Sequence, residues 1–350
     1  MSENDQGRET ESFRQAAGAS IQAARKLAEI YLDRCGVEEA GDNASLLLQH
    51  VLGLNRAELL RDGREAFPAE RLAAWEEAIT RKGRGEPAQY IAGEQWFYGR
   101  PFAVTPAVLI PRPETELLVE AVLQAADRLW PQAAGSAGTE ASAEALPGSA
   151  KPAASALRSA GLEAPAAAAA PVVLDVGTGS GAIAVTLAAE RPAWRVHASD
   201  LSPEALRTAE GNALRLGAEL SAFIEGDLLQ PFLASGGGSM EGLEIDVLVS
   251  NPPYIPAGDL PGLQREVREF EPRLALDGGE DGLNPYRAMA VQLKLLTRLP
   301  SVVGFELGMG QARQVAALLE EIGHWDDISI VTDYGGIERH VVAVRSPGSE

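Results

Sequence analysis

Residues 174–181 have the sequence Leu-Asp-Val-Gly-Thr-Gly-Ser-Gly, and this segment decides the fold. It begins inside the apolar run 172–176 and ends where the amphipathic stretch 182–190 starts, so it predicts a turn from a buried strand into a helix. Glycines let the backbone approach a ligand closely, which predicts a site for a nucleotide-like cofactor. Gly177, Gly179 and Ala182 also fit the dinucleotide pattern G-x-G-x-x-A, so a nicotinamide cofactor stays open at this point.

Short apolar runs and amphipathic stretches alternate along the whole second half of the chain. The apolar runs are 172–176, 195–198, 222–224, 245–249 and 302–305, and the amphipathic stretches are 182–190, 203–216, 285–299 and 311–322. This alternation predicts a doubly wound α/β domain with a parallel sheet. Two last apolar runs, 328–332 and 340–344, flank a turn at 333–336 and predict an antiparallel pair at the end of the sheet.

The first half of the chain has a different pattern. Apolar residues at spacings of three and four predict a small all-helical domain over 19–88, with Asp42 or Asn43 at the start of its second helix. Aromatic residues around Gly99 predict a hairpin in a linker over 89–112. A helix from about 114 to 129 then opens a catalytic domain over 113–346. Residues 1–18 are expected to be disordered, and so is an Ala-rich insert at 131–170, for which a marginal helix over 164–170 is the alternative.

Composition excludes several classes of protein. The 350 residues suggest two domains, and 30 Lys plus Arg against 50 Asp plus Glu leave a net charge of -20 without any basic block. A protein that binds phosphate backbones is normally basic, so stable nucleic-acid binding is not expected. A single cysteine, Cys35, and four scattered histidines exclude an intramolecular disulfide and a structural zinc site. The polar N-terminus and the lack of a long apolar run predict a cytoplasmic protein without membrane contact.

Acidic residues follow the second and third predicted strands. Asp200 ends the second strand, where a carboxylate can accept hydrogen bonds from both ribose hydroxyls of either cofactor. Asp227 and Leu228 follow the third strand, where an adenine amine and ring face can be met. A helix or turn cap is an equally good interpretation of Asp227.

Residues 251–254, Asn-Pro-Pro-Tyr, follow the fourth predicted strand at the edge where ligands of such sheets bind. Two prolines remove two backbone donors and stiffen the turn, so its carbonyl oxygens are expected to stay unpaired. With the side-chain carbonyl of Asn251 and the ring of Tyr254, this turn suits a planar NH2 group. Acceptors on the hydrogens of an amide nitrogen favour the transition state in which that nitrogen takes a methyl group. A hydride-transfer enzyme has no use for such a pocket.

The glycine loop, Asp200 and the Asn-Pro-Pro-Tyr turn, in that order, resemble those of class I S-adenosyl-L-methionine-dependent methyltransferases. More narrowly, the chain resembles the peptide chain release factor glutamine methyltransferases from about Gly36 to Val344. The segments that carry this likeness are Gln89-Tyr90-Ile91-Ala92-Gly93, Phe97-Tyr98-Gly99 and Ile110-Pro111-Arg112-Pro113-Glu114-Thr115-Glu116. Adenine amino methyltransferases also contain the Asn-Pro-Pro-Tyr sequence. It is therefore the Arg-Pro-Glu-Thr-Glu segment that favours the glutamine methyltransferases over them.

The resemblance implies a Rossmann-like methyltransferase sheet, S-adenosyl-L-methionine as cofactor and the glutamine of the release factors' Gly-Gly-Gln motif as methyl acceptor. The helical domain is then expected to grip the release factor. The residues implied in cofactor binding are Asp175, Gly177, Thr178, Gly179, Ser180, Gly181, Asp200, Asp227, Leu228 and Asn251. Those implied in substrate binding are Arg112, Glu114, Asn251, Pro252, Pro253 and Tyr254, of which Asn251, Pro252 and Tyr254 carry the catalysis. For Arg112 and Glu114, an ion pair that pins the linker is an equally good interpretation.

Three other functions remain open on the sequence. A nicotinamide-dependent oxidoreductase would use the same glycine loop but not Asn251. An adenine methyltransferase acting on nucleic acid would use the same turn, and the net charge of -20 opposes it. A helical binding module joined to a cofactor sensor would show no turnover.

Overall fold

The computed structural model of the protein describes residues 12–15, 18–131, 170–234 and 237–346. The chain divides into two compact units, of which one contains Met1–Pro111 and Pro253–Gly282 and the other Arg112–Pro252 and Leu283–Glu350. Most of the expected tail 1–18 and of the expected insert 131–170 lies outside the described residues.

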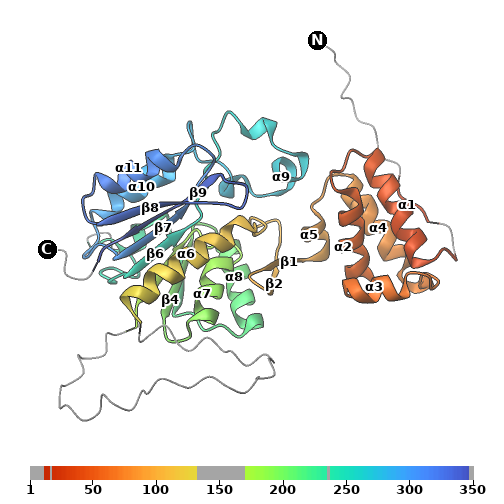
Figure 1. Ribbon diagram of the computed structural model, residues 1–350, viewed down its shortest axis with the longest axis horizontal. Helices are drawn as coiled ribbons and strands as arrows, with labels where there is room; N and C mark the ends of the chain where they lie inside the picture. The colour runs from red at the N-terminus through yellow and green to blue at the C-terminus, as the bar shows by residue number, and fades with distance from the viewer. Residues whose placement is uncertain (1–11, 16–17, 132–169, 235–236, 347–350) are drawn as a thin grey trace, which may run out of the picture. The chain divides into compact units, whose positions relative to one another are not determined.

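The second unit contains a seven-stranded sheet among its described residues, with strand order β5-β4-β3-β6-β7-β9-β8 (Figure 1). Strands β3 to β7 run parallel, whereas β9 pairs antiparallel with both β7 and β8. The strands are β3 (Val172–Val176), β4 (Arg195–Asp200), β5 (Ala222–Glu225), β6 (Val247–Ser250), β7 (Val302–Glu306), β8 (Asp327–Thr332) and β9 (Glu338–Val344). The expected doubly wound α/β fold with an antiparallel end is confirmed.

Helices flank this sheet on both faces (Figure 1). Helices α6, α7 and α8 pack side by side on one face, and α10 and α11 pack together on the other. Every residue of β3 and of β7 is buried, as expected for strands covered by helices on both sides. The helices are α6 (Glu114–Leu129), α7 (Ala182–Glu190), α8 (Pro203–Leu216), α10 (Asn284–Leu293) and α11 (Ala312–Glu320), with a 3-10 turn η2 (Gln230–Phe232).

Several elements of the second unit differ from their expected bounds, among them α10 and β6. Helix α10 ends at Leu293 instead of reaching 299, and Leu295 and Leu296 make tighter turn hydrogen bonds to residues three positions back. Pro300 follows, and a proline disfavours helical geometry in the residue before it. Strand β6 begins at Val247 rather than 245, because the Asp246 carboxylate accepts a 2.8 Å hydrogen bond from the backbone N–H of Val172.

The first unit is mainly helical. Its elements are α1 (Ile21–Arg34), α2 (Ala40–Leu52), α3 (Arg56–Asp62), η1 (Ala69–Arg71), α4 (Leu72–Gly83), α5 (Ala88–Ala92), β1 (Glu94–Phe97), β2 (Arg100–Ala103), η3 (Leu260–Gly262), α9 (Arg265–Phe270) and η4 (Arg273–Ala275). Phe13 is buried against Tyr31 and Trp75 in the core of this unit. The expectation of a disordered tail over 1–18 is therefore wrong for residues 12–15, because one aromatic side chain anchors them.

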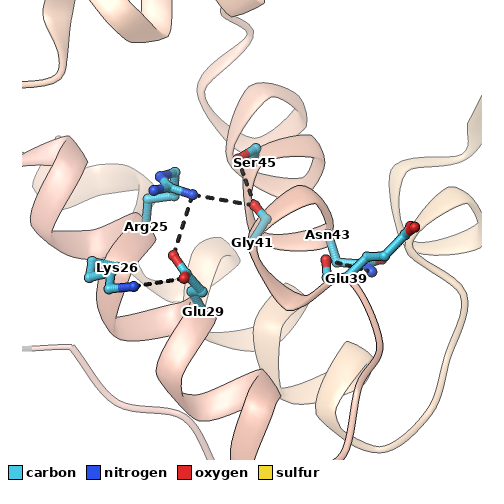
Figure 2. Close-up of polar contacts among 7 residues, drawn as sticks. All are labelled: Arg25, Lys26, Glu29, Glu39, Gly41, Asn43 and Ser45. Carbon is cyan, nitrogen blue, oxygen red and sulfur yellow. Dashed lines mark hydrogen bonds and ion pairs between the residues drawn. The ribbon is translucent and has the colours of Figure 1, made fainter.

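Helix α2 begins earlier than the sequence suggested. Its N-cap is Glu39, which has left-handed backbone geometry and no side-chain cap, rather than Asp42 or Asn43. The Asn43 amide donates instead to the carbonyl oxygen of Glu39, at 3.2 Å (Figure 2). In the same view, Arg25 of α1 reaches the carbonyl oxygen of Gly41 at 3.5 Å, which ties α1 to the first turn of α2.

The linker 89–112 contains more structure than a hairpin. Helix α5 occupies its start, and β1 and β2 then pair antiparallel around Tyr98 and Gly99. Both turn residues have positive φ, 50° and 70°, as two-residue hairpin turns with the twist of the strands require.

Residues 253–282 return to the helical unit although they lie far away in the sequence. Lys82 of α4 is buried and forms an ion pair with Glu266 of α9. Gln264 donates to the Glu38 carboxylate at 2.8 Å, and the carboxylate of Glu271 accepts from the backbone N–H of Ile110 at 3.3 Å. Polar contacts thus join residues 253–282 to the N-terminal part of the same unit.

Candidate active site

The predicted site segments follow four neighbouring parallel strands. Hydrogen bonds join the strand ends: Ser250 Oγ donates to the carbonyl oxygen of Val176 at 2.6 Å, and Gly177 N donates to that of Ser199 at 2.9 Å. Gly226 N donates to the carbonyl oxygen of Asp200 at 3.0 Å. The glycine loop, Asp200, the segment 226–228 and Asn251 therefore meet at the carboxyl edge of the sheet, where ligands of such folds bind.

The glycines of the loop have two different roles. Gly177 and Gly179 have φ of 71° and 57°, and a Cβ at either position would meet no atom within 4 Å. Their backbone therefore faces open space in which a ligand can approach. Gly181 also has a positive φ, but its Cβ would lie 3.1 Å from the Cβ of Ala209, so it brings the start of α7 close to α8.

Asp175 supports the loop from beneath. It is 0 % exposed, and its Oδ2 accepts hydrogen bonds from Thr178 Oγ1 at 2.7 Å and from Ala184 N at 3.1 Å. Its Oδ1 has no hydrogen-bond partner among the described residues. Burial without a neighbouring positive charge raises the pKa of the Asp175 carboxyl to about 7. Thr178 and Ser180 are buried as well, so a ligand would meet mainly the backbone of the loop.

Asp200 lies at the end of β4 and is partly exposed. Its Oδ2 accepts from Gly179 N at 2.8 Å and its Oδ1 from Ser202 N at 2.9 Å. Burial raises the pKa of this carboxyl, and the backbone donors oppose that shift. Because each carboxylate oxygen has two lone pairs, both oxygens retain capacity for the hydroxyls of a ribose.

The segment after β5 is sharply constrained. A Cβ on Gly226 would lie 2.1 Å from Cγ of Pro231, so only glycine fits there. Leu228 has a φ of 52°, a strained conformation for a branched side chain that is found most often at functional sites. Asp227 is exposed and Leu228 half-buried, so both remain available to a ligand.

Asn251 is held in one orientation. Its Nδ2 donates to Thr115 Oγ1 at 3.3 Å, and its buried Oδ1 has no hydrogen-bond partner in the described part of the chain. The carbonyl oxygen of Pro252 accepts no hydrogen bond from the described residues either. Two acceptors on consecutive residues are thus left for an external donor.

The other expected substrate residues are distributed between the units. Pro253 and Tyr254 belong to the helical unit, whereas Arg112 and Glu114 begin the sheet unit together with Asn251 and Pro252. Glu114, in the first turn of α6, forms no ion pair with any described residue. An ion pair of Glu114 that pins the linker, the alternative interpretation of this pair of charges, is therefore absent from the described structure.

Thr115 is the contact that sequence reasoning missed. It is 4 % exposed and lies between the charged residues Glu114 and Glu116 in the Arg-Pro-Glu-Thr-Glu segment. Its hydroxyl oxygen accepts the hydrogen bond from Asn251 Nδ2. One indication of this role was present in the sequence, a hydroxyl side chain within the Arg-Pro-Glu-Thr-Glu segment. The contact itself could not be predicted, because Thr115 and Asn251 are 136 residues apart in the chain.

The helical unit has a cavity of about 1100 Å³ of its own. Residues of α1, α2 and α3 and the start of β1 line it, among them Arg25, Gln49 and Trp96. Leu60, also on its wall, is 80 % exposed, and Trp96 is 61 % exposed. Two large apolar side chains thus lie exposed at a cavity whose wall also carries polar groups.

Within the described residues, no group of three or more His, Cys, Asp or Glu side chains could hold a metal ion. No helix there is long and apolar enough to cross a membrane.

Comparison with known proteins gives consistent matches over most of the chain. Residues 23–93 match the family model "PrmC N-terminal domain" and residues 154–262 the model "Methyltransferase small domain". A release factor glutamine methyltransferase of Bacillus anthracis is 38% identical, with 92% of this chain and 98% of that protein covered. Proteins of the same name from Moorella thermoacetica (38% identical, 95% and 99% covered) and Chlorobaculum tepidum (40% identical, 87% and 90% covered) are similar to the same extent.

Proposed function

This chain belongs to the family of release factor glutamine methyltransferases, and we propose from that premise that it methylates peptide chain release factors. The methyl group passes from S-adenosyl-L-methionine to the side-chain amide nitrogen of the glutamine in the factor's Gly-Gly-Gln motif. Nicotinamide-dependent oxidation and adenine methylation are not favoured, because all the relatives named above are glutamine methyltransferases. Because release factors are cytoplasmic, this substrate agrees with the expected cytoplasmic location.

The unpartnered Oδ1 of Asn251 is the observation that supports this assignment within the structure. A buried carbonyl oxygen without a donor is costly, because it has lost its water and gained nothing in exchange. A primary amide carries two N–H donors, one for Asn251 Oδ1 and one for the carbonyl oxygen of Pro252. Tyr254 follows these acceptors in the chain, and its ring can pack on the planar amide.

The residues present fit S-adenosyl-L-methionine. The open space at Gly177 and Gly179 lets the loop backbone approach the methionine moiety, and Asp200 can accept from the ribose hydroxyls. Leu228 and Asp227 would flank the adenine, and Asp175, Thr178 and Ser180 would support the loop from inside. When bound, the cofactor supplies a methyl group on a positively charged sulfur. Gly181 would complete the loop around the cofactor, and its lack of a side chain lets α7 begin close to α8.

The protein's own contribution is to make a poor nucleophile attack. The lone pair of an amide nitrogen is delocalised into its carbonyl group, so the nitrogen must pyramidalise to accept a methyl group. Hydrogen bonds to Asn251 and Pro252 strengthen as positive charge develops on that nitrogen, which lowers the barrier selectively. The nitrogen would gain a bond to the methyl carbon as that carbon's bond to sulfur breaks, with the electron pair left on a neutral thioether, and the nitrogen would release one proton to solvent.

Methyl transfer to purified release factor tests the proposal directly. With methyl-labelled S-adenosyl-L-methionine, label should appear on a release factor, and a factor with Gly-Gly-Ala in place of Gly-Gly-Gln should remain unlabelled. Label on the altered factor, or none on either, would refute the assignment.

Asn251→Ala separates catalysis from cofactor binding. The variant loses one acceptor that acts in the transition state, so turnover should fall on the order of 10²-fold or more. Affinity for S-adenosyl-L-methionine, measured by calorimetry, should change much less. Asn284→Ala, an exposed asparagine in the same unit, is the matched control and should keep full turnover. An Asn251→Ala enzyme with normal turnover would show that this oxygen has no part in the reaction.

The release factor is also the partner we assign to the helical unit. Leu60 and Trp96 at the cavity are large apolar side chains left in solvent, and aromatic anchors of this kind often dominate protein interfaces. Loss of both should raise the KM for intact release factor roughly tenfold or more. Turnover of a short peptide containing Gly-Gly-Gln should not change, because such a peptide is too small to need a second contact.

The variant for this test is Leu60→Asp combined with Trp96→Asp. Leu214→Asp on α8, which alters a leucine that is 85 % exposed in the other unit, is the control for an added surface charge. Equal KM values for intact factor in all three proteins would mean that the cavity face does not bind it.

A further inference from the structure

Thr115 and Asn251 form a hydrogen bond between the first turn of α6 and the turn after β6. Asn251 Nδ2 donates to Thr115 Oγ1 at 3.3 Å, and Thr115 is almost completely buried. Both residues belong to the sheet unit. Because the amide nitrogen has this partner, the amide oxygen is the end of the Asn251 side chain that stays unpartnered among the described residues.

We propose that Thr115 is a positioning residue, whose hydroxyl holds the Asn251 amide with its oxygen toward the methyl-accepting nitrogen. This inference rests on the proposed function and extends it to a residue that does not itself touch the substrate. It also gives a role to the Arg-Pro-Glu-Thr-Glu segment, in which α6 begins.

The chemistry explains why orientation matters. An asparagine amide has an acceptor at one end and a donor at the other, and a half-turn about its last torsion exchanges them. The substrate amide nitrogen offers only N–H donors to its surroundings. With the oxygen forward, it finds an acceptor. With the NH2 group forward, two donors face each other and the transition-state hydrogen bond is lost.

The position of Thr115 is secured by the packing of its helix. A Cβ on Gly304 of β7 would lie 2.6 Å from Val122 and 3.2 Å from Leu118, so α6 lies directly on the glycine backbone of β7. Strand β7 is paired in register with β6, where Ser250 immediately precedes Asn251. Donor and acceptor of the hydrogen bond are therefore carried by a sheet and by a helix that packs directly on it.

The test compares Thr115→Val, which keeps the shape and loses the hydroxyl, with Thr115→Ser, which keeps the hydroxyl. Turnover on intact release factor should fall roughly tenfold in Thr115→Val, the scale of one hydrogen bond in a buried site. Thr115→Ser should recover most of the wild-type rate. The dissociation constant for S-adenosyl-L-methionine, measured by calorimetry, should stay within about twofold of wild type in both variants.

Thr186→Val is the matched control. Thr186 is a fully buried threonine of α7 whose Oγ1 has no hydrogen-bond partner within the described structure. Its conversion to valine therefore repeats the chemical change without the proposed contact, and turnover should not fall. Should Thr115→Val fold poorly, as shown by its thermal midpoint, the ratio between Thr115→Ser and Thr115→Ala decides the question in its place.

A double-mutant cycle shows whether Thr115 acts through Asn251. In an Asn251→Ala background, Thr115→Val should cost no further turnover, because the amide that it orients is gone. Additive losses, or a cofactor affinity that falls in parallel with turnover, would overturn the proposal. Methylation by the wild-type enzyme is measured first, so failure of the proposed function is seen separately from failure of this inference.

Discussion

Asp175 is an ionisable group that folding removes from water. Its pKa is raised to about 7 in the folded protein, from 3.8, mainly because burial disfavours the charged form. A raised carboxyl pKa means that the folded state holds the proton more tightly than the unfolded state. Its contribution to stability is therefore complete below about pH 4 and is lost as the pH rises toward 7.

Asp175→Asn should remove this pH dependence. The asparagine oxygen can still accept from Thr178 and Ala184, while its NH2 group takes the place of the unpartnered Oδ1. Relative to wild type, the variant should gain on the order of 2 kcal/mol of unfolding free energy between pH 5 and pH 8. Urea denaturation of both proteins without cofactor measures this difference. A constant offset at the two pH values would contradict the burial argument.

Some residues of the candidate site could be predicted from the sequence and others could not. Asn251, Asp200 and the glycines could be found because each follows a strand end at a recognisable spacing. Thr115 could not, because its role depends on a contact with a residue 136 positions away. The difference between Gly177 and Gly179, which face open space, and Gly181, which packs against a helix, likewise could not be predicted, because it depends on Ala209 in α8.

Helix α6 illustrates what an element contributes beyond its residues. Gly304→Ala in β7 would place a methyl group 2.6 Å from Val122, so it should destabilise the protein by about 1–3 kcal/mol through overpacking. The φ of Gly304 is not in the left-handed region, so the cost comes from the contact alone. Adding Val122→Ala should restore part of the loss, as measured by urea denaturation. A double variant no more stable than Gly304→Ala would point to a different cause.

Most helices and strands could be predicted because apolar residues recur at helical spacing in the helices and form short continuous runs in the buried strands. Helices α6, α7 and α8 and strand β3 have the bounds that the apolar pattern predicts. Helix α9 was missed, since it contains no buried residue that would produce an apolar period. The early start of α2 was missed because its N-cap, Glu39, has none of the usual capping chemistry.

At the scale of the molecule, one compact unit is made from two separated stretches of chain. The ion pair of Lys82 with Glu266 joins them across 184 residues. Glu266→Gln leaves a buried ammonium group without its carboxylate and should lower the thermal midpoint of unfolding by several degrees. Lys82→Met removes the charge and keeps an apolar side chain, so it should cost less.

Lys26→Met is the control for this comparison, because Lys26 pairs with Glu29 on an exposed surface of α1, where ion pairs contribute little. A midpoint for Glu266→Gln equal to that of Lys26→Met would contradict the argument. The sequence predicted only domains made of one continuous stretch of chain. It could not predict that residues 253–282 join the helical unit, because one ion pair between distant residues produces no local sequence pattern.

The oxygen of Asn251 that lacks a donor also sets a rule for inhibitor design. A compound that joins an adenosine-like group to a primary amide or an amino group can complete that oxygen's hydrogen bonding and should bind well. An ester or methyl ether of the same outline offers only lone pairs to it and should bind far worse. An inhibitor of this enzyme should therefore place an N–H donor opposite the side-chain oxygen of Asn251.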